Sequence, residues 1–138
     1  MASTFIYGGR NKALKVLELF ARRSIPVAGV CLTAEDQHEK GANQELLDYC
    51  QGKGILTFPE KAIHDPWLKD FILSQNVRFA FIAQWRRILP EALVDAPELG
   101  TFAIHLSLLP KYRGFAPLNW ALINGENKTG ATLFKVSA

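Results

Sequence analysis

A histidine at the end of a short apolar segment is the residue of this sequence best suited to chemistry. His105 follows the segment 101–104, and a loop containing Pro110, Arg113 and Gly114 comes after it. Ligands of open α/β sheets bind just beyond the carboxyl ends of the strands, where an imidazole is well placed to transfer protons. A histidine can equally be a structural hydrogen-bonding group beneath a loop. The residue pattern alone leaves both roles open.

Two further segments carry residue types that bind anions. Gly8 and Gly9 follow the first apolar segment, and glycines there let backbone N–H groups approach a phosphate. The full glycine pattern of a dinucleotide-binding loop is missing, because Arg10 fills one of the later positions, so a structural turn is the alternative. Arg86 and Arg87 form the second segment. The alternative to an anion site there is a solvated loop.

Composition limits the classes of protein that fit. The 138 residues are 49% hydrophobic and predict one compact domain. A formal charge of +3 suits an anionic ligand without requiring nucleic acid. The amino terminus lacks a signal-peptide core, and no apolar run approaches the roughly 20 residues of a membrane span. We therefore expect a soluble, cytoplasmic protein with no membrane partner.

Metal and nucleophile chemistry find no support in the spacing of the residues. Cys31 and Cys50 have no neighbouring Cys or His at ligand spacing, so we expect reduced thiols and no metal site. A Ser-His-Asp or Cys-His arrangement cannot be assembled either.

Alternating strands and helices must position the candidate residues. Short β-branched or aromatic segments predict strands, and apolar residues three and four apart predict helices. Asp65 is expected to cap the third helix ahead of Pro66. The order predicts a Rossmann-like α/β fold with a doubly wound, mainly parallel sheet. We expect strands at 4–7, 25–33, 55–58, 77–83, 101–104 and 129–136, and helices at 13–20, 43–53, 66–76, 91–94 and 117–124.

The central stretch closely resembles the folate-dependent formyltransferases. It reads HLSLLPKYRG over 105–114, APLNWA over 116–121, GE at 125–126 and TGAT over 129–132. The family includes methionyl-tRNA formyltransferase, glycinamide ribonucleotide formyltransferase and the sugar-nucleotide N-formyltransferases. Its amino-terminal catalytic domain is a Rossmann-like sheet with this order of elements, so a looser resemblance covers the whole chain.

The resemblance implies transfer of a formyl group from N10-formyltetrahydrofolate to a primary amine through a tetrahedral intermediate. Such a step needs a group that manages the amine proton and donors aimed at the oxyanion. The family uses an Asn-x-His pair and a later Asp, and His105 matches the His. Two loops match those that hold the pterin and line the cleft: Arg87, Ile88 and Leu89, then Ser107, Leu108 and Leu109.

Two turns resemble the sugar-nucleotide branch more than the tRNA enzyme. They are the segments 8–11 and 84–86. We therefore expect a nucleotide-linked amino sugar as the small-molecule acceptor. The residues expected to contact it are Gly8, Gly9, Arg10, Trp85 and Arg113.

The sequence departs from the family in two places. Ala103 stands where the family has Asn, and losing one oxyanion donor typically costs about 10²- to 10³-fold in rate. The family's Asp follows the last strand, and this sequence stops at Ala138 before reaching it. A doubly wound sheet also usually has a helix after such a strand. We therefore expect residues 1–138 to be an incomplete catalytic, folate-binding domain, truncated at its carboxyl end, with little or no activity.

Other classes of function remain open at this point. Methionyl-tRNA formyltransferase would add a nucleic-acid partner. A non-catalytic member of the fold would bind folate or a nucleotide or serve in assembly, and self-association of the chain is also open. An ordinary dinucleotide-binding domain is the third class.

Overall fold

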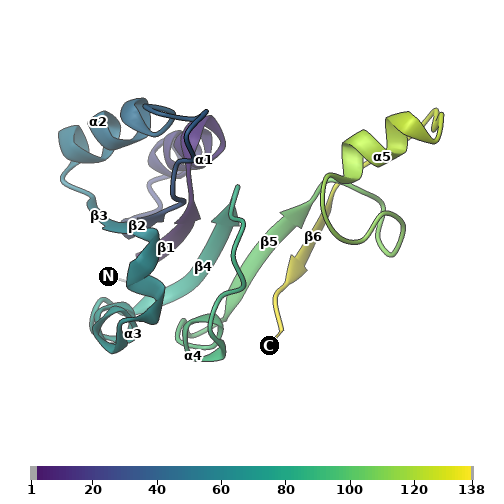
Figure 1. The fold of residues 1–138 in the computed structure, drawn as a ribbon. Coiled ribbons are helices and arrows are strands. Elements are labelled where there is room, and N and C mark those ends of the chain that lie inside the picture. The colour runs from purple at the N-terminus through teal and green to yellow at the C-terminus, as the bar shows by residue number, and fades with distance from the viewer. Residues whose placement is uncertain (1–2, 138) are drawn as a thin grey trace.

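The computed structural model describes residues 3–137 and contains one six-stranded sheet (Figure 1). The strand order is β3-β2-β1-β4-β5-β6. The first five strands run parallel, and β6 runs antiparallel to β5. The mainly parallel, Rossmann-like sheet predicted from the sequence is therefore confirmed. The strands are β1 (Ser3–Gly8), β2 (Val27–Leu32), β3 (Leu56–Pro59), β4 (Val77–Ala83), β5 (Thr101–His105) and β6 (Thr132–Lys135).

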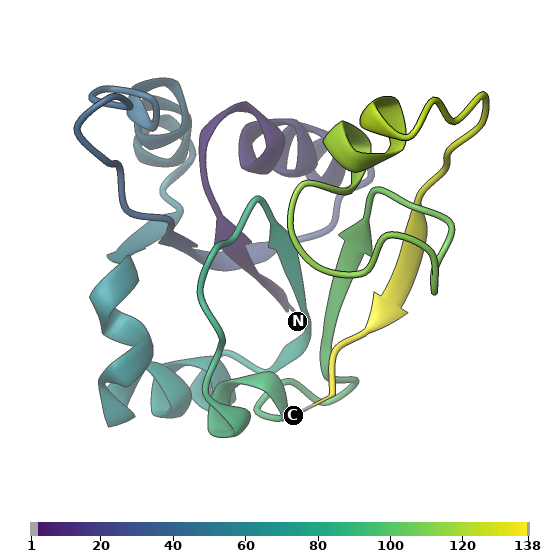
Figure 2. The same cartoon turned by 45° about the vertical axis from the view of Figure 1, so that its right-hand side comes forward.

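Helices cover both faces of the sheet. α1 and α2 lie on one side of it, and α3 and α4 lie on the other (Figure 1). α5 lies beyond the carboxyl end of β5, as Figures 1 and 2 both show. The helices are α1 (Arg10–Arg22), α2 (Gln44–Lys53), the 3-10 helix η1 (Glu60–His64), α3 (Pro66–Ser74), α4 (Glu91–Val94) and α5 (Pro117–Ile123).

The central strand β1 is buried along its whole length and sends side chains into both cores. Phe5 and Tyr7 join the cluster beneath α3 and α4, whereas Ile6 joins the cluster with Leu17 of α1. A strand covered on both faces reads as a continuous apolar run rather than an alternating one. This explains why the sequence signals for β1 and β2 are short and unbroken.

The chain order reverses between β1 and β4, which are neighbours at the centre of the sheet. Gly8 lies opposite Ala83 in this pairing, and a Cβ on Gly8 would lie 2.0 Å from the Ala83 carbonyl oxygen. Only glycine fits at such an approach. The crevice beyond these two strand ends is where ligands of open α/β sheets bind.

The last third of the chain is less buried than the rest. Both hydrophobic clusters draw their buried members from residues 5–94. By contrast, nine of the fifteen exposed large hydrophobic side chains within residues 3–137 lie between Ile104 and Phe134. Residues 95–137 therefore supply no buried member of either cluster, although Ala96 and Val136 pack against one of them.

Several predicted boundaries were wrong, for local reasons. The last strand forms only over Thr132–Lys135 because its partner β5 ends at His105, opposite Thr132. Asp65 precedes α3 in extended conformation but makes no side-chain capping bond. The short η1 helix was not predicted. Within residues 3–137, no helix is long and apolar enough to cross a membrane.

Candidate active site

His105 is the last residue of β5 and is half-buried. Its Nε2 atom lies 2.7 Å from the carbonyl oxygen of Tyr112. A carbonyl oxygen only accepts hydrogen bonds, so Nε2 carries the proton, and Nδ1 is the basic nitrogen of the neutral ring. The loop thus selects the tautomer and leaves one nitrogen for proton transfer.

Thr132 and Ser107 hold the loop that follows His105. The Thr132 hydroxyl donates to the Ser107 carbonyl over 2.7 Å and accepts from the Leu109 N–H over 3.2 Å. The fully buried Ser107 hydroxyl donates to the carbonyl of Lys111 over 2.6 Å. These bonds fix the backbone of the loop against β6, so the carbonyl that orients His105 is itself fixed.

Glu126 connects the far end of the same loop to the end of α5. The Tyr112 hydroxyl donates to Glu126 Oε1 over 2.7 Å, and Lys111 forms an ion pair with the same carboxylate. Hydrogen bonds from Lys111 and Tyr112 lower the pKa of Glu126. Arg113, next in the chain, is exposed.

Ala103 occupies the position two residues before His105 on the same strand. Residues two apart on a strand share a face. Thr101 marks this face as the α4 side, because its hydroxyl donates to the carbonyl of Val94. Ala103 is 8% exposed, and its methyl group offers no hydrogen bond there. An amide at position 103 would point to the same side of the sheet as the imidazole.

The turn after β4 is anchored to neighbouring elements. The partly buried Trp85 ring packs edge to face against Tyr7, with 5.7 Å between ring centroids. Arg87 Nε donates to Glu60 over 2.9 Å, and Glu60 also accepts from the Ala34 N–H over 2.8 Å. Desolvation opposes the ionisation of Glu60, but these two hydrogen bonds prevail and lower its pKa.

A groove of about 750 Å³ lies beside this turn. It contains Arg87 and Ile88 of the loop predicted to hold the pterin, and the side chain of Ile88 is 94% exposed. The side chain of Leu89 instead points into the core, at 8% exposure. His105 does not line the groove. The lining residues are Ala34, Pro59, Glu60, Lys61, Ile63, His64, Arg86, Arg87 and Ile88.

Lys61 and His64 in this groove were not expected from the sequence. Both belong to η1, whose five residues are too short to give a periodic signal. A sequence signal that would have found them is the position of the segment just after β3, at the same sheet edge as Arg86.

The backbone N–H groups of Gly9 and Arg10 both form hydrogen bonds within the protein. The Gly9 N–H donates to the Ala83 carbonyl over 3.2 Å, and the Arg10 N–H donates to Asn43 Oδ1 over 2.8 Å. The Arg10 side chain forms an ion pair with Glu39. This turn therefore offers an anion its arginine side chain rather than a cradle of N–H groups.

The predicted residues fall into two groups. His105, Ser107 and Leu109 come together at the ends of β5 and β6, whereas Gly8–Arg10 and Trp85–Arg87 gather at the ends of β1 and β4. The residues described by the structure contain no cluster of three or more His, Cys, Asp or Glu side chains that could hold a metal ion.

A doubly wound sheet with a loop-oriented histidine at a strand end agrees with the family comparison. Residues 4–138 match the family described as formyl transferase. The chain therefore belongs to the formyl transferase family.

Among its relatives are methionyl-tRNA formyltransferases. That of Syntrophus aciditrophicus is 32% identical over 136 residues, which cover 95% of this chain and 43% of the relative. That of Thermodesulfovibrio yellowstonii is 47% identical over 94 residues, covering 68% and 28% respectively. The chain thus spans less than half the length of these relatives.

Solved structures agree on the fold. Glycinamide ribonucleotide transformylase 1 from Geobacillus kaustophilus matches with a TM-score of 0.79 at 19% identity, over 100% of this chain and 76% of that one. A formyltetrahydrofolate deformylase from Pseudomonas syringae matches with a TM-score of 0.71 at 17% identity, over 99% and 47%.

Proposed function

We propose that this domain transfers a formyl group from N10-formyltetrahydrofolate to the primary amine of a nucleotide-linked amino sugar. The observation that carries the proposal is the family match over residues 4–138 together with His105 at the end of β5. The loop after His105 is the one whose sequence most closely resembles the family, and it sets the orientation of the ring.

His105 would manage protons in this reaction. When the new carbon–nitrogen bond forms, the amine loses one proton, and N10 gains one as its bond to the formyl carbon breaks. A single basic nitrogen near both atoms can take the proton from the amine and then donate it to N10. The Nδ1 atom of His105 is free for this role because Nε2 is bonded to Tyr112.

The groove beside Arg87 and Ile88 fits a folate donor, which supplies the formyl carbon. Ile88 offers an exposed apolar side chain to a flat ring, and Lys61 offers a cation to a carboxylate tail. A ligand pocket of this size, with apolar walls and few charges, is typical for molecules of this kind.

A small acceptor is favoured over tRNA by the arrangement of the charges around the central crevice. Binding a nucleic acid requires several cations spread along a phosphate backbone. Arg10 and Arg86 instead converge on the single carboxylate of Glu39, which suits one compact anion. The alternative acceptor is methionyl-tRNA, which is supported by the names of the relatives.

Weak activity follows from Ala103, since its side chain cannot stabilise an oxyanion. The test compares the wild-type chain with Ala103→Asn, with Ala92→Asn as a control at an exposed site. Release of tetrahydrofolate is followed with a panel of nucleotide-linked amino sugars and with methionyl-tRNA.

We expect Ala103→Asn to raise the rate with an amino sugar by about 10²- to 10³-fold, and the control to leave it unchanged. Formyl transfer to methionyl-tRNA alone would favour the alternative acceptor. If circular dichroism shows that both variants fold, and neither they nor the wild type formylate any amine or bind tetrahydrofolate by calorimetry, the proposal is wrong.

A further inference from the structure

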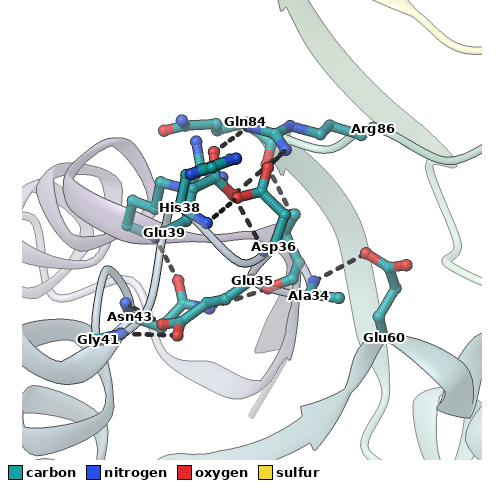
Figure 3. A network of polar contacts seen from close by, with 12 residues as sticks. Ala34, Glu35, Asp36, His38, Glu39, Gly41, Asn43, Glu60, Gln84 and Arg86 are labelled. Atoms are coloured by element: carbon teal, nitrogen blue, oxygen red, sulfur yellow. Dashed lines mark hydrogen bonds and ion pairs between the residues drawn. The ribbon is translucent and has the colours of Figure 1, made fainter.

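Two arginines converge on one carboxylate at the point where the strand order reverses. Arg10 follows the end of β1, and Arg86 follows the end of β4, the neighbouring central strand. Glu39 comes from the loop between β2 and α2. Figure 3 shows Glu39 and Arg86 in this network of polar contacts.

One carboxylate serves both guanidinium groups. Arg86 Nη2 lies 2.6 Å from Glu39 Oε1, and Arg86 Nη1 donates to Oε2 over 3.3 Å. Arg10 Nη2 forms an ion pair with Oε2. The hydrogen bond from Arg86 is the largest contribution that lowers the pKa of Glu39. Asp36 adds a weaker contact to Arg86, at 3.6 Å.

The arginines sit on fixed turns. The Arg10 backbone adopts φ +57°, and its N–H is bonded to Asn43, whose side chain is 6% exposed and also donates to the Thr33 carbonyl over 2.9 Å. Arg86 follows Gln84, whose carbonyl accepts from the Thr33 hydroxyl over 2.8 Å. Both cation-bearing turns are therefore tied to the same buried pair, Thr33 and Asn43.

Glu39, in contrast, sits on a segment with no helix or strand, and residues 34–38 just before it are exposed. Most of the contacts that hold its carboxylate are those with the two arginines themselves. The two arginines are thus on turns tied to the strand ends, whereas Glu39 is on a loop held chiefly by hydrogen bonds within itself, such as those from the Gly41 and Asn43 N–H groups to Glu35.

We propose that Arg10 and Arg86 form a clamp for a phosphate or diphosphate group, and that Glu39 occupies this clamp until the ligand displaces it. Arginine forks bind phosphate oxygens in the bidentate way that they bind a carboxylate. The location at the crevice between β1 and β4 is where an open sheet of this kind receives its ligand. The inference that this phosphate or diphosphate belongs to the acceptor's nucleotide rests on the proposed function. The inference that the two arginines bind such an anion does not.

The first test measures binding of pyrophosphate to the full chain by calorimetry at fixed ionic strength. Glu39→Gln keeps the shape of the side chain but removes its charge. Glu98→Gln is the control, because Glu98 is exposed and precedes β5 at the opposite end of the strands, so its loss changes the net charge equally.

We expect Glu39→Gln to bind pyrophosphate at least about tenfold more tightly than Glu98→Gln, since a competing charge-assisted pair is gone. Adding Arg86→Gln to Glu39→Gln should abolish the gain. Equal affinities in Glu39→Gln and Glu98→Gln would overturn the clamp.

A second measurement needs no variant. The Glu39 N–H is bonded to the Asp36 carbonyl and the Ala42 N–H to the Glu39 carbonyl. Saturating pyrophosphate should speed hydrogen exchange of these two amides in the wild type, because displacement of Glu39 frees the loop. Unchanged or slower exchange at saturation would mean that Glu39 stays in place and would refute the displacement.

Neither test uses folate or an amine, so failure of the clamp is distinguishable from failure of formyl transfer. Repeating the titration with uridine and thymidine diphosphates identifies the source of the group. If these nucleotides bind more tightly than pyrophosphate, the clamp recognises the diphosphate of a nucleotide. If they bind equally, it recognises the free anion.

Discussion

Replacing Gly8 by alanine should strongly destabilise the protein, because the added methyl has no room. Its Cβ would lie 2.0 Å from the Ala83 carbonyl oxygen, so β1 and β4 must separate by about 1 Å. That shift strains the bond from the Gly9 N–H to the Ala83 carbonyl and the bond from the Thr33 N–H to the Gly8 carbonyl. Overpacking of about 1–3 kcal/mol and two hydrogen bonds of about 1 kcal/mol each give a loss of roughly 3–5 kcal/mol.

Gly52→Ala is the matched control for this substitution. Gly52 lies in α2, and a Cβ there would meet nothing within 4 Å. Alanine is the better helix former, so the same added methyl should stabilise the protein by about 0.5 kcal/mol. Gly9→Ala should fall between the two, because its Cβ would approach a side-chain atom, Asn43 Oδ1, at 2.9 Å.

Urea unfolding followed by circular dichroism measures the free energies of unfolding of the wild type and the three variants. The expected order of stability is Gly52→Ala, wild type, Gly9→Ala, Gly8→Ala. A loss below about 1 kcal/mol for Gly8→Ala would refute the packing argument, since overpacking alone should exceed it.

Three other expectations follow from the contacts of single side chains. Thr132→Val should cost about 1–2 kcal/mol of unfolding free energy by removing two loop hydrogen bonds, whereas Thr129→Val, at an exposed site, should change it by less than about 0.5 kcal/mol. Burial raises the pKa of Cys31 to about 12 and that of Cys50 to about 11, so Ellman's reagent at pH 8 should label both only after denaturation, and rapid labelling of the folded protein would contradict their burial. The pKa of Glu39 is lowered, chiefly by its hydrogen bond from Arg86, so its stabilisation is complete above the unfolded value of about 4.3 and is lost as the pH falls through the folded value. The difference in Tm between wild type and Glu39→Gln should therefore be constant from about pH 5 to 8 and shrink below about pH 4, and a difference that does not vary down to pH 3 would show that the ion pair is not responsible.

The fold could be predicted because the local signals agree with one another. The limits of β4 and α4 match the predicted segments, since Val77–Ala83 is a bounded apolar run and Pro90 starts the helix. The antiparallel direction of β6 could not be predicted, because side-chain alternation is the same for either direction. It depends on how the 105–131 segment returns to the sheet.

The candidate site was predicted only in part, because the ion pairs between residues far apart in the sequence were not found. His105 was found through its place after a strand and through the family resemblance. The partners that decide how the arginines behave, Glu39 for Arg86 and Glu60 for Arg87, lie 47 and 27 residues away along the chain. Charge pairs at such separations leave no periodic signal in a sequence, so the sequence left both an anion site and a solvated loop open for Arg86 and Arg87.

Because no residue after Val94 is a buried member of either hydrophobic cluster, the described parts of the molecule differ in local stability. Regions with few buried apolar contacts open at lower free energy than the core strands do. The segment from β5 to β6, with His105, should open while β1, β2 and β4 stay closed. The proposed catalytic histidine and the proposed anion clamp would then belong to different cooperative units. Mild denaturant should disorder the histidine while pyrophosphate still binds between Arg10 and Arg86.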